Sequence, residues 1–365
     1  NNPFPVAATS IAFDADNDWH VAASGQRMGS LPGGGTGGFA ATGLFSTRKN
    51  TCVTRRRFMT AFNGGRLRVH DGQLLLPMNR VRDDLTAFAS RPVGDNLTGF
   101  GPWSEEPVDG LANVLTGTFD VLADGTRVLV GADASTSRLA LFRRAPGGAW
   151  TRTPLDVSPH GDVVYDKSGR AHFVTFRGWE EDILLWSEQA DGTFASEEVT
   201  GSNPNGGHHS AAVAVAPDGS MRVATGHRGI TVYDKRNGAW TATRLTSTTT
   251  MLDFEIDAAG VHHFWSTTQQ RLTYVRWDGT TVTRELPALS GALDPNARPD
   301  VVVSADGQVA LVIGAGDVAV RPTDADAHRK EVTLTVERTG EGTVTIEGLT
   351  GSCGSTCTFR VPAGR

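Results

Sequence analysis

The sequence has little charge, few aromatic side chains and no long hydrophobic run. Charged residues make up 20% of its 365 residues and aromatic residues 7%. No apolar stretch approaches the roughly twenty residues that a membrane-spanning helix needs. The formal net charge of -6 provides no basic field for phosphate backbones, which argues against nucleic acid as a partner. Because the chain also begins at Asn1 rather than at Met, we expect a processed, soluble product without a membrane span.

Cysteine is scarce, with three residues in the chain. Cys353 and Cys357 lie four positions apart in a segment rich in Gly, Ser and Thr, which predicts a small disulfide. No second pair of Cys or His lies near them to complete a tetrahedral zinc site, so we expect no metal and no cofactor. A disulfide favours an oxidising compartment, and the protein is expected to be secreted or held at the cell surface. The sequence assigns no role to Cys52.

Motifs that would indicate an enzyme are also lacking. There is no G-x-S-x-G elbow or other nucleophile motif. The Gly-rich run from Ser30 has no Lys for a phosphate loop. Asp14, Asp16 and Asp18 alternate as in a calcium loop, but the Gly and the distant Glu of that loop are missing. These absences favour a binding protein over an enzyme.

Glycine is abundant, with 43 residues, and it marks a repeat. Seven segments consist of an apolar strand, a predicted two-residue turn containing Gly, and a second apolar strand. They are AFDADNDWHVA from Ala12, LRVHDGQLLL from Leu67, FDVLADGTRVLV from Phe119, VVYDKSGRAHFV from Val163, VAVAPDGSMRVA from Val213, FEIDAAGVHHFW from Phe254 and VVVSADGQVALV from Val301. The turn Gly stands at positions 72, 125, 169, 219, 260 and 307, which are 53, 44, 50, 41 and 47 apart by subtraction, and Asn17 replaces it in the first copy.

A second hairpin completes each repeat. Its first strand reads LALFRR from Leu139, ILLWSE from Ile183 and ITVYDK from Ile230. Four strands in 41 to 53 residues match one blade of a β-propeller. The sequence therefore predicts an all-β fold, a seven-bladed β-propeller over residues 1–326 that is closed by pairing of its terminal segments.

Some aromatic and imidazole side chains recur at the same place in successive repeats. Trp150, Phe194 and Trp240 share one position, and His20, His172 and His263 share another. A side chain that recurs with the repeat usually packs one blade against the next or holds a turn. We therefore interpret both sets as structural rather than as ligand-binding or catalytic.

The pattern changes after Pro322, and residues 327–365 read as a short β-rich extension. The segments GEGTVT from Gly340 and CGSTCTFRVPAG from Cys353 resemble the Gly-rich β-repeats with a CGxxC hairpin that follow many secreted bacterial proteins. In that family further strands follow, so an end at Arg365 predicts a truncated module. The resemblance also implies export.

The blade repeat itself resembles repeats of secreted bacterial propellers and, more loosely, those of sialidase-type propellers. The S-x-D-x-G-x-T-W box of the sialidase type is absent from every copy, so the resemblance does not imply sialidase chemistry. Seven blades and an extracellular location are what it implies.

Residues that break the repeat cluster in the fourth and fifth copies, in segments expected at one sector of one propeller face. They are His160, Arg177, Trp179, His208, His209, His227 and Arg228. Arg can bind a carboxylate through two hydrogen bonds, Trp can stack on a sugar ring, and His can transfer protons near neutral pH. The set is suited to an acidic glycan, although His and Arg are also common in loops that bind nothing.

Three functions remain open from the sequence. The first is a monomeric recognition module that binds a glycan or another extracellular macromolecule. The second is a polysaccharide lyase or glycoside-cleaving enzyme with His208 and His227 as catalytic residues, because the outline HxS…DG…GH loosely resembles that of certain propeller polysaccharide lyases. The third is a structural or adhesion scaffold. The absence of a catalytic motif favours the first.

Overall fold

The computed structural model consists of β-strands and their connections, and no helix occurs in the part of the chain that it describes. The described residues are 6–15, 19–30, 36–46, 51–55, 60–61, 66–80, 85–93, 104–114, 118–177, 182–200, 210–226, 229–246, 250–268, 271–278, 281–285, 300–303, 309–315, 317–322, 331–337, 344–345, 352–353 and 356–362. Over these ranges there is accordingly no helix long and apolar enough to cross a membrane.

Strands β1 to β29 form antiparallel sheets of three to five strands, and each sheet is built from strands that follow one another in the chain. The first three sheets are β1 (Val6–Phe13), β2 (Trp19–Ser30), β3 (Thr36–Ser46) and β4 (Thr51–Arg55); β5 (Thr60–Ala61), β6 (Arg68–His70), β7 (Gln73–Arg80), β8 (Leu85–Pro92) and β9 (Ser104–Pro107); and β10 (Leu111–Val114), β11 (Asp120–Val121), β12 (Arg127–Asp133), β13 (Leu139–Arg144) and β14 (Thr151–Pro154).

The next sheets are β15 (His160–Tyr165), β16 (Ala171–Arg177), β17 (Asp182–Glu188) and β18 (Phe194–Thr200); β19 (Ala211–Val215), β20 (Met221–Gly226), β21 (Ile230–Arg236) and β22 (Ala239–Arg244); β23 (Thr250–Ile256), β24 (His262–Thr268), β25 (Arg271–Trp277) and β26 (Thr281–Glu285); and β27 (Asp300–Val303), β28 (Val309–Ala315) and β29 (Asp317–Pro322).

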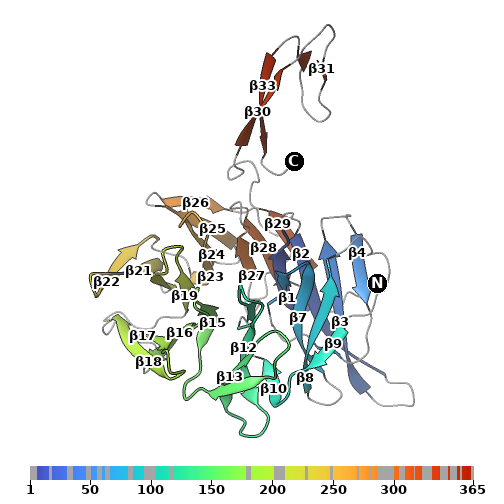
Figure 1. Cartoon of the computed structure of the whole chain (residues 1–365), viewed down its shortest axis with the longest axis vertical. Helices are drawn as coiled ribbons and strands as arrows, with labels where there is room; N and C mark the ends of the chain where they lie inside the picture. Colours follow the sequence, from blue (N-terminus) through green and yellow to red (C-terminus); the bar gives the residue numbers. More distant parts are fainter. Residues whose placement is uncertain are drawn as a thin grey trace.

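The sheets surround a common centre, and the first strands of successive sheets lie next to one another, as with β15, β19, β23 and β27 (Figure 1). Antiparallel sheets of consecutive strands arranged radially in this way form a β-propeller. The all-β propeller predicted from the repeat is therefore confirmed.

The turn at the first hairpin differs from the prediction in most sheets. In the β15–β16 hairpin the amide of Gly169 donates to the carbonyl of Asp166 at 2.8 Å, and Asp166 in turn donates to Arg170. Three residues therefore connect the two strands, with Gly169 at a φ of 79° that favours glycine. The β11–β12, β19–β20 and β23–β24 hairpins repeat this pattern. The two-residue turn occurs between β6 and β7, at Asp71 and Gly72.

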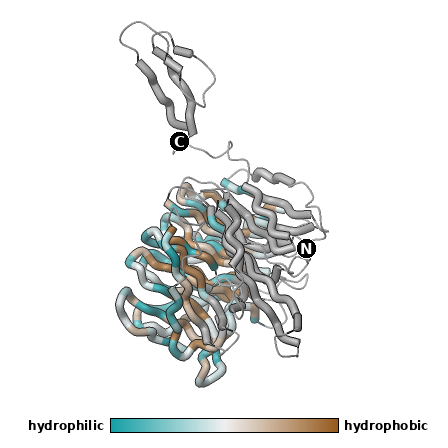
Figure 2. Tube along the Cα trace, turned by 90° about the vertical axis from the view of Figure 1, so that its right-hand side faces the viewer, coloured by the Kyte–Doolittle hydropathy of each residue, from teal (hydrophilic) through white to brown (hydrophobic). Residues whose placement is uncertain are grey.

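The hydrophobic core lies between neighbouring sheets. Phe88 on β8 stacks on Trp150, just before β14, with ring centroids 5.2 Å apart and planes 4° apart. Phe194 and Trp240 pack in the same way against clusters that join the next sheets along the chain. The prediction that these aromatic residues are structural is confirmed. Figure 2 shows hydrophobic segments along the described strands and hydrophilic segments at the outer turns.

The first and last sheets of the ring meet by packing. Strand β1 lies against β27 and β28, yet among the described strands β1 pairs with β2 and β27 with β28. The predicted closure by pairing of terminal segments is thus not found in the described residues. Each sheet already contains its own consecutive strands, so no described strand crosses the seam.

An ion cluster spans the ring axis. Arg66, just before β6, forms ion pairs with Asp162 on β15 and with Glu255 on β23, the latter at 3.5 Å between Nη1 and Oε1. These strands belong to three sheets that are not neighbours in the ring, so their side chains can meet only across the centre. Arg66 therefore bridges the central channel.

The C-terminal strands are β30 (Glu331–Glu337), β31 (Val344–Thr345), β32 (Ser352–Cys353) and β33 (Thr356–Pro362). Strand β30 pairs with β33 and β31 pairs with β32, so these strands pair only with one another in the described residues. This pairing is compatible with the predicted boundary near residue 326, which remains a prediction. The side chains of Cys353 and Cys357 lie outside the described residues, and so does that of Cys52.

Candidate functional site

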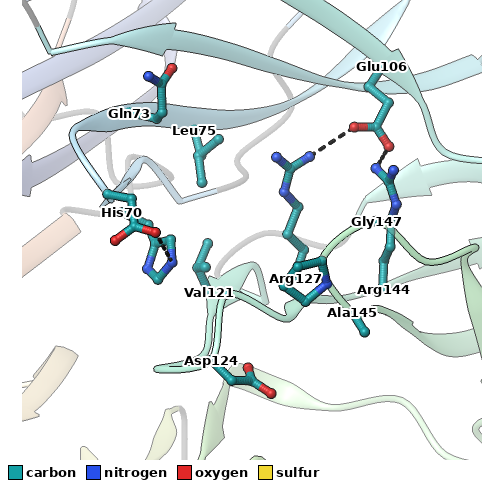
Figure 3. Close-up of a pocket in the computed structure, with 13 residues that line it drawn as sticks. His70, Gln73, Leu75, Glu106, Val121, Asp124, Arg127, Arg144, Ala145 and Gly147 are labelled. Carbon is teal, nitrogen blue, oxygen red and sulfur yellow. Dashed lines mark hydrogen bonds and ion pairs between the residues drawn. The ribbon is translucent and has the colours of Figure 1, made fainter.

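A solvent-open pocket of about 350 Å³ lies between the β5–β9 sheet and the β10–β14 sheet (Figure 3). We call it the junction pocket. It is lined by His70, Asp71, Gln73, Leu75, Glu106, Val121, Asp124, Gly125, Arg127, Arg144, Ala145, Pro146 and Gly147. The lining comes from the β6–β7 turn, the β11–β12 turn and the β13–β14 turn, together with β9. Its volume is in the range of small-ligand sites.

Two arginines and one glutamate form the positive end of the pocket. Arg127 on β12 stands directly opposite Arg144 on β13, an arrangement that is unfavourable for two like charges. Glu106 on β9 of the neighbouring sheet compensates for it, because its carboxylate pairs with Arg127 Nη1 at 3.0 Å and also with Arg144 Nη1 (Figure 3). The cluster carries one more positive than negative charge.

Arg127 is held in a partly buried position. Its guanidinium carbon lies 5.6 Å from the ring centroid of Phe88 on β8, a cation–π contact with the core of the neighbouring sheet. Burial lowers the pKa of Arg127 from its ordinary value. In the described residues, Arg127 has one hydrogen-bond partner, Glu106. Arg127 donates to it through Nη1, and Nε and Nη2 remain as further donors of the guanidinium.

The other end of the pocket carries acidic groups and an imidazole. His70 Nε2 lies 3.4 Å from a carboxylate oxygen of Asp71. Asp124 has a lowered pKa because the backbone amide and the hydroxyl of Thr126 donate to its carboxylate. Gly125 follows Asp124 and lies close to His70: a Cβ at Gly125 would meet Pro146 Cγ at 3.2 Å and His70 Nε2 at 3.3 Å. The pocket is therefore polar at both ends and opposite in charge from one end to the other.

The next two junctions along the chain have balanced ion pairs. Between the β10–β14 and β15–β18 sheets, Glu188 binds Arg143, with Arg143 Nη2 at 2.5 Å from Oε2, and also accepts the amide of Ala171 at 2.9 Å. Between the next two sheets, Lys235 pairs with Glu197. Each of these junctions has one cation for one carboxylate. The arginine end of the junction pocket differs, because Arg127 and Arg144 share the single carboxylate of Glu106 there, while Asp71 and Asp124 lie at the other end of the pocket.

Arg177 is the one predicted site residue whose side chain is described. It lies at the end of β16, where Nη2 contacts Asp182 Oδ2 at 2.9 Å and Glu198 Oε2 at 2.5 Å. Arg177 donates these hydrogen bonds, and they raise its pKa, with the bond to Asp182 contributing most and the bond to Glu198 next. The guanidinium is thus engaged by carboxylates of its own sheet.

The remaining predicted site residues are not brought together by the described part of the chain. His160 begins β15, and only its backbone is described, paired with Val174. Trp179, His208, His209, His227 and Arg228 lie outside the described residues. Their convergence in one sector therefore remains a prediction.

The junction pocket lies at the opposite edge of the sheets from Arg177. Arg177 ends β16 at the connection to β17, whereas the pocket is lined by turns that correspond to the other end of β16, next to Gly169. Sequence reasoning missed this pocket. A signal was present, because the copy LRVHDGQLLL has a shorter turn segment than the others.

The recurring histidines are structural, as predicted. His20, His172 and His263 each contact the carboxylate six residues earlier, at 2.9, 3.3 and 3.1 Å. All three imidazoles are buried, and burial lowers the pKa of His172. These pairs hold the base of the first hairpin in their sheets. Asp14 is thus the partner of His20.

No protein-family model and no curated protein matches the chain. Solved structures match in fold. A catalytically inactive virginiamycin B lyase from Staphylococcus aureus with quinupristin has a TM-score of 0.57 at 8% identity over 88% of this chain and 95% of that chain. The β-propeller domain of the Trilobed protease from Pyrococcus furiosus, described as having an open velcro topology, has a TM-score of 0.56 at 9% identity over 88% and 94%.

A third similar structure is YCF48 bound to D1 peptide, with a TM-score of 0.54 at 14% identity over 88% of this chain and 95% of that chain. Identities this low establish the fold and not the function, because one propeller fold serves many unrelated activities.

Proposed function

We propose that this protein is a recognition propeller that binds an extracellular macromolecule through the junction pocket. The observation that supports this function is the open pocket in which Arg127 and Arg144 share the single carboxylate of Glu106. Guanidinium groups at a concave surface bind anionic groups, whereas the described residues that line the pocket include no Ser, Thr, Cys or Lys to act as a nucleophile. Among proteins of similar fold, YCF48 has been solved with a peptide.

The proposal includes a seven-bladed ring, in which each sheet from β1 to β29 is one blade. The spacing of the turn glycines supports this number, and the last blade would then have three described strands. We further propose that the protein is secreted or held at the cell surface and that Cys353 and Cys357 form a disulfide. Mass measurement with and without reduction tests the disulfide.

Immobilised panels of glycans, cell-wall fractions and peptides test the recognition function directly. We expect the full chain to be retained by at least one ligand class. If that class is a glycan bound in the predicted sector, Trp179→Ala should weaken retention about tenfold, because a stacked aromatic ring contributes on the order of 1 to 2 kcal/mol. Retention on none of the panels would contradict a recognition function.

A polysaccharide lyase is the second candidate, supported by His208 and His227 in the predicted sector. A lyase acting on uronate polymers creates a double bond that absorbs ultraviolet light. We expect any such absorbance to be abolished in the His208→Ala and His227→Ala variants. If the unaltered protein produces no absorbance across a panel of uronate polymers, the lyase candidate is eliminated while the recognition function is unaffected.

A further inference from the structure

The positive charge at the Arg127–Arg144 end of the junction pocket indicates the chemistry of its ligand. Like-charged Arg127 and Arg144 face each other across two strands and share one carboxylate. A second carboxylate would complete the cluster with two negative charges for two positive ones. Arg127 can accept it, because in the described residues its Nε and Nη2 have no hydrogen-bond partner, and these two atoms bind a carboxylate through parallel hydrogen bonds.

The space next to Arg127 is suited to an aliphatic group. Leu75 and Val121 line the pocket between its two charged ends (Figure 3). Pro146 also lines it, with Cγ 3.2 Å from where a Cβ on Gly125 would lie. A carboxylate with an aliphatic neighbour is a common feature of peptides, in which acidic and branched side chains alternate freely.

The same features disfavour an acidic polysaccharide. A sugar ring is commonly held on an aromatic face, and the described residues lining the pocket include no Phe, Tyr or Trp. A polyuronate also carries one negative charge per sugar, so that its next carboxylate would approach Asp71 and Asp124 at the opposite end. A ligand with a single carboxylate avoids this repulsion.

We propose that the junction pocket binds an acidic peptide, with a ligand carboxylate on Arg127 and Arg144 and the adjacent aliphatic side chain on Leu75 and Val121. This inference rests on the proposed recognition function and specifies its ligand. Because the ligand carboxylate binds Arg127 beside Glu106, the two carboxylates lie next to each other and their like charges repel.

Fluorescently labelled peptides test the proposal without any substitution in the protein. The probes are pentapeptides, acetylated at the N-terminus and amidated at the C-terminus, with a central Glu between Val and Leu residues, each paired with a twin that carries Gln instead. Fluorescence polarisation with the full chain should show binding of the Glu peptides, at least about tenfold tighter than the Gln twins, and weakening as salt is raised. Equal binding of the twins would overturn the proposal.

Three substitutions separate ligand binding from a merely structural ion cluster. Arg127→Gln should weaken the binding of the Glu peptides about tenfold. Glu106→Gln should strengthen the binding of these peptides several-fold, because it removes the negative charge next to the ligand carboxylate. A structural cluster would instead make both substitutions act in the same direction, on the thermal midpoint alone. Arg138→Gln is the matched control, since Arg138 is exposed next to the far end of the same β12–β13 pair, and it should leave binding unchanged.

The outcomes also separate failure of the peptide proposal from failure of the proposed recognition function. If uronate oligosaccharides bind and Arg127→Gln weakens them, the pocket is used but the peptide class is wrong. If ligands are retained by the protein and Arg127→Gln has no effect on any of them, the pocket assignment fails while recognition stands. If no ligand of any class is retained, the proposed function itself fails.

Discussion

His172 and Asp166 show how an ionisable pair can serve folding. His172 Nε2 lies 3.3 Å from the Asp166 carboxylate, and Ser168 and the backbone of Arg170 also donate to Asp166. Burial alone would raise the pKa of Asp166, but these hydrogen bonds outweigh it and lower the pKa to about 2. The pair has no access to a pocket among those described and repeats in other sheets, so its contribution is to stability.

The low pKa of Asp166 predicts a loss of stability in acid. The folded-state pKa is below the ordinary value of 3.8, so the stabilisation is complete above pH 3.8 and is lost as the pH falls towards 2. Asp166→Asn should therefore lower the free energy of unfolding by up to about 2 kcal/mol at pH 7 and by much less at pH 2.5. Urea unfolding at the two pH values measures the difference. An equal loss at both would show that the charge of Asp166 is unimportant.

Two ion pairs join neighbouring sheets of the ring and differ in burial. Arg143 and Glu188 join two sheets through a carboxylate that is 4% exposed, whereas Lys235 and Glu197 join the next two through groups that are 37% and 39% exposed. Both links have the same charge pattern and differ in burial. They therefore allow a buried and an exposed inter-sheet ion pair to be compared within one protein.

We expect Glu188→Gln to cost about 3 kcal/mol of unfolding free energy, because it leaves a partly buried guanidinium without its counter-charge. Glu197→Gln is the matched control and should cost less than about 1 kcal/mol, since exposed pairs are weak and screened. Chemical denaturation of both variants provides the comparison. Similar costs for the two would mean that the burial of Glu188 contributes little.

The strands were largely predictable from the sequence, and the pocket was not. Alternating apolar residues around a turn Gly predicted the β11–β12, β15–β16, β19–β20 and β23–β24 hairpins because the pattern that makes a strand is local. The turn length was wrong in these hairpins, because the Gly at the end of the turn segment fits two- and three-residue connections alike. The pocket depends on Glu106 meeting Arg127 and Arg144 from a neighbouring sheet, and no local pattern encodes that contact.

The ring has one junction, between its first and last sheets, at which the chain does not continue directly from one sheet to the other. We call this junction the seam. At the other junctions the chain itself continues from one sheet to the next, whereas β1 meets β27 and β28 by packing in the described residues. Opening at this seam breaks no described β-ladder. The terminal sheets should therefore open more readily than the sheets opposite them, which are held on both sides.

Hydrogen exchange followed by mass spectrometry tests this expectation. Peptides from β1–β3 and β27–β29 should exchange at least about tenfold faster than peptides from β16 and β20, which belong to internal sheets. The exchange of β24 provides an internal reference near the seam. Uniform protection around the ring would indicate that the seam is as strong as the other junctions.

Each described sheet of the ring takes its strands from one uninterrupted stretch of chain, and this has a consequence for protein engineering. A circular permutant opened between any two sheets would keep every described ladder intact, because no strand would be separated from its partners. New termini could thus be placed on either side of Arg127 and Arg144, between whole sheets, to carry a reporter close to the pocket. The scaffold lends itself to conversion into a sensor.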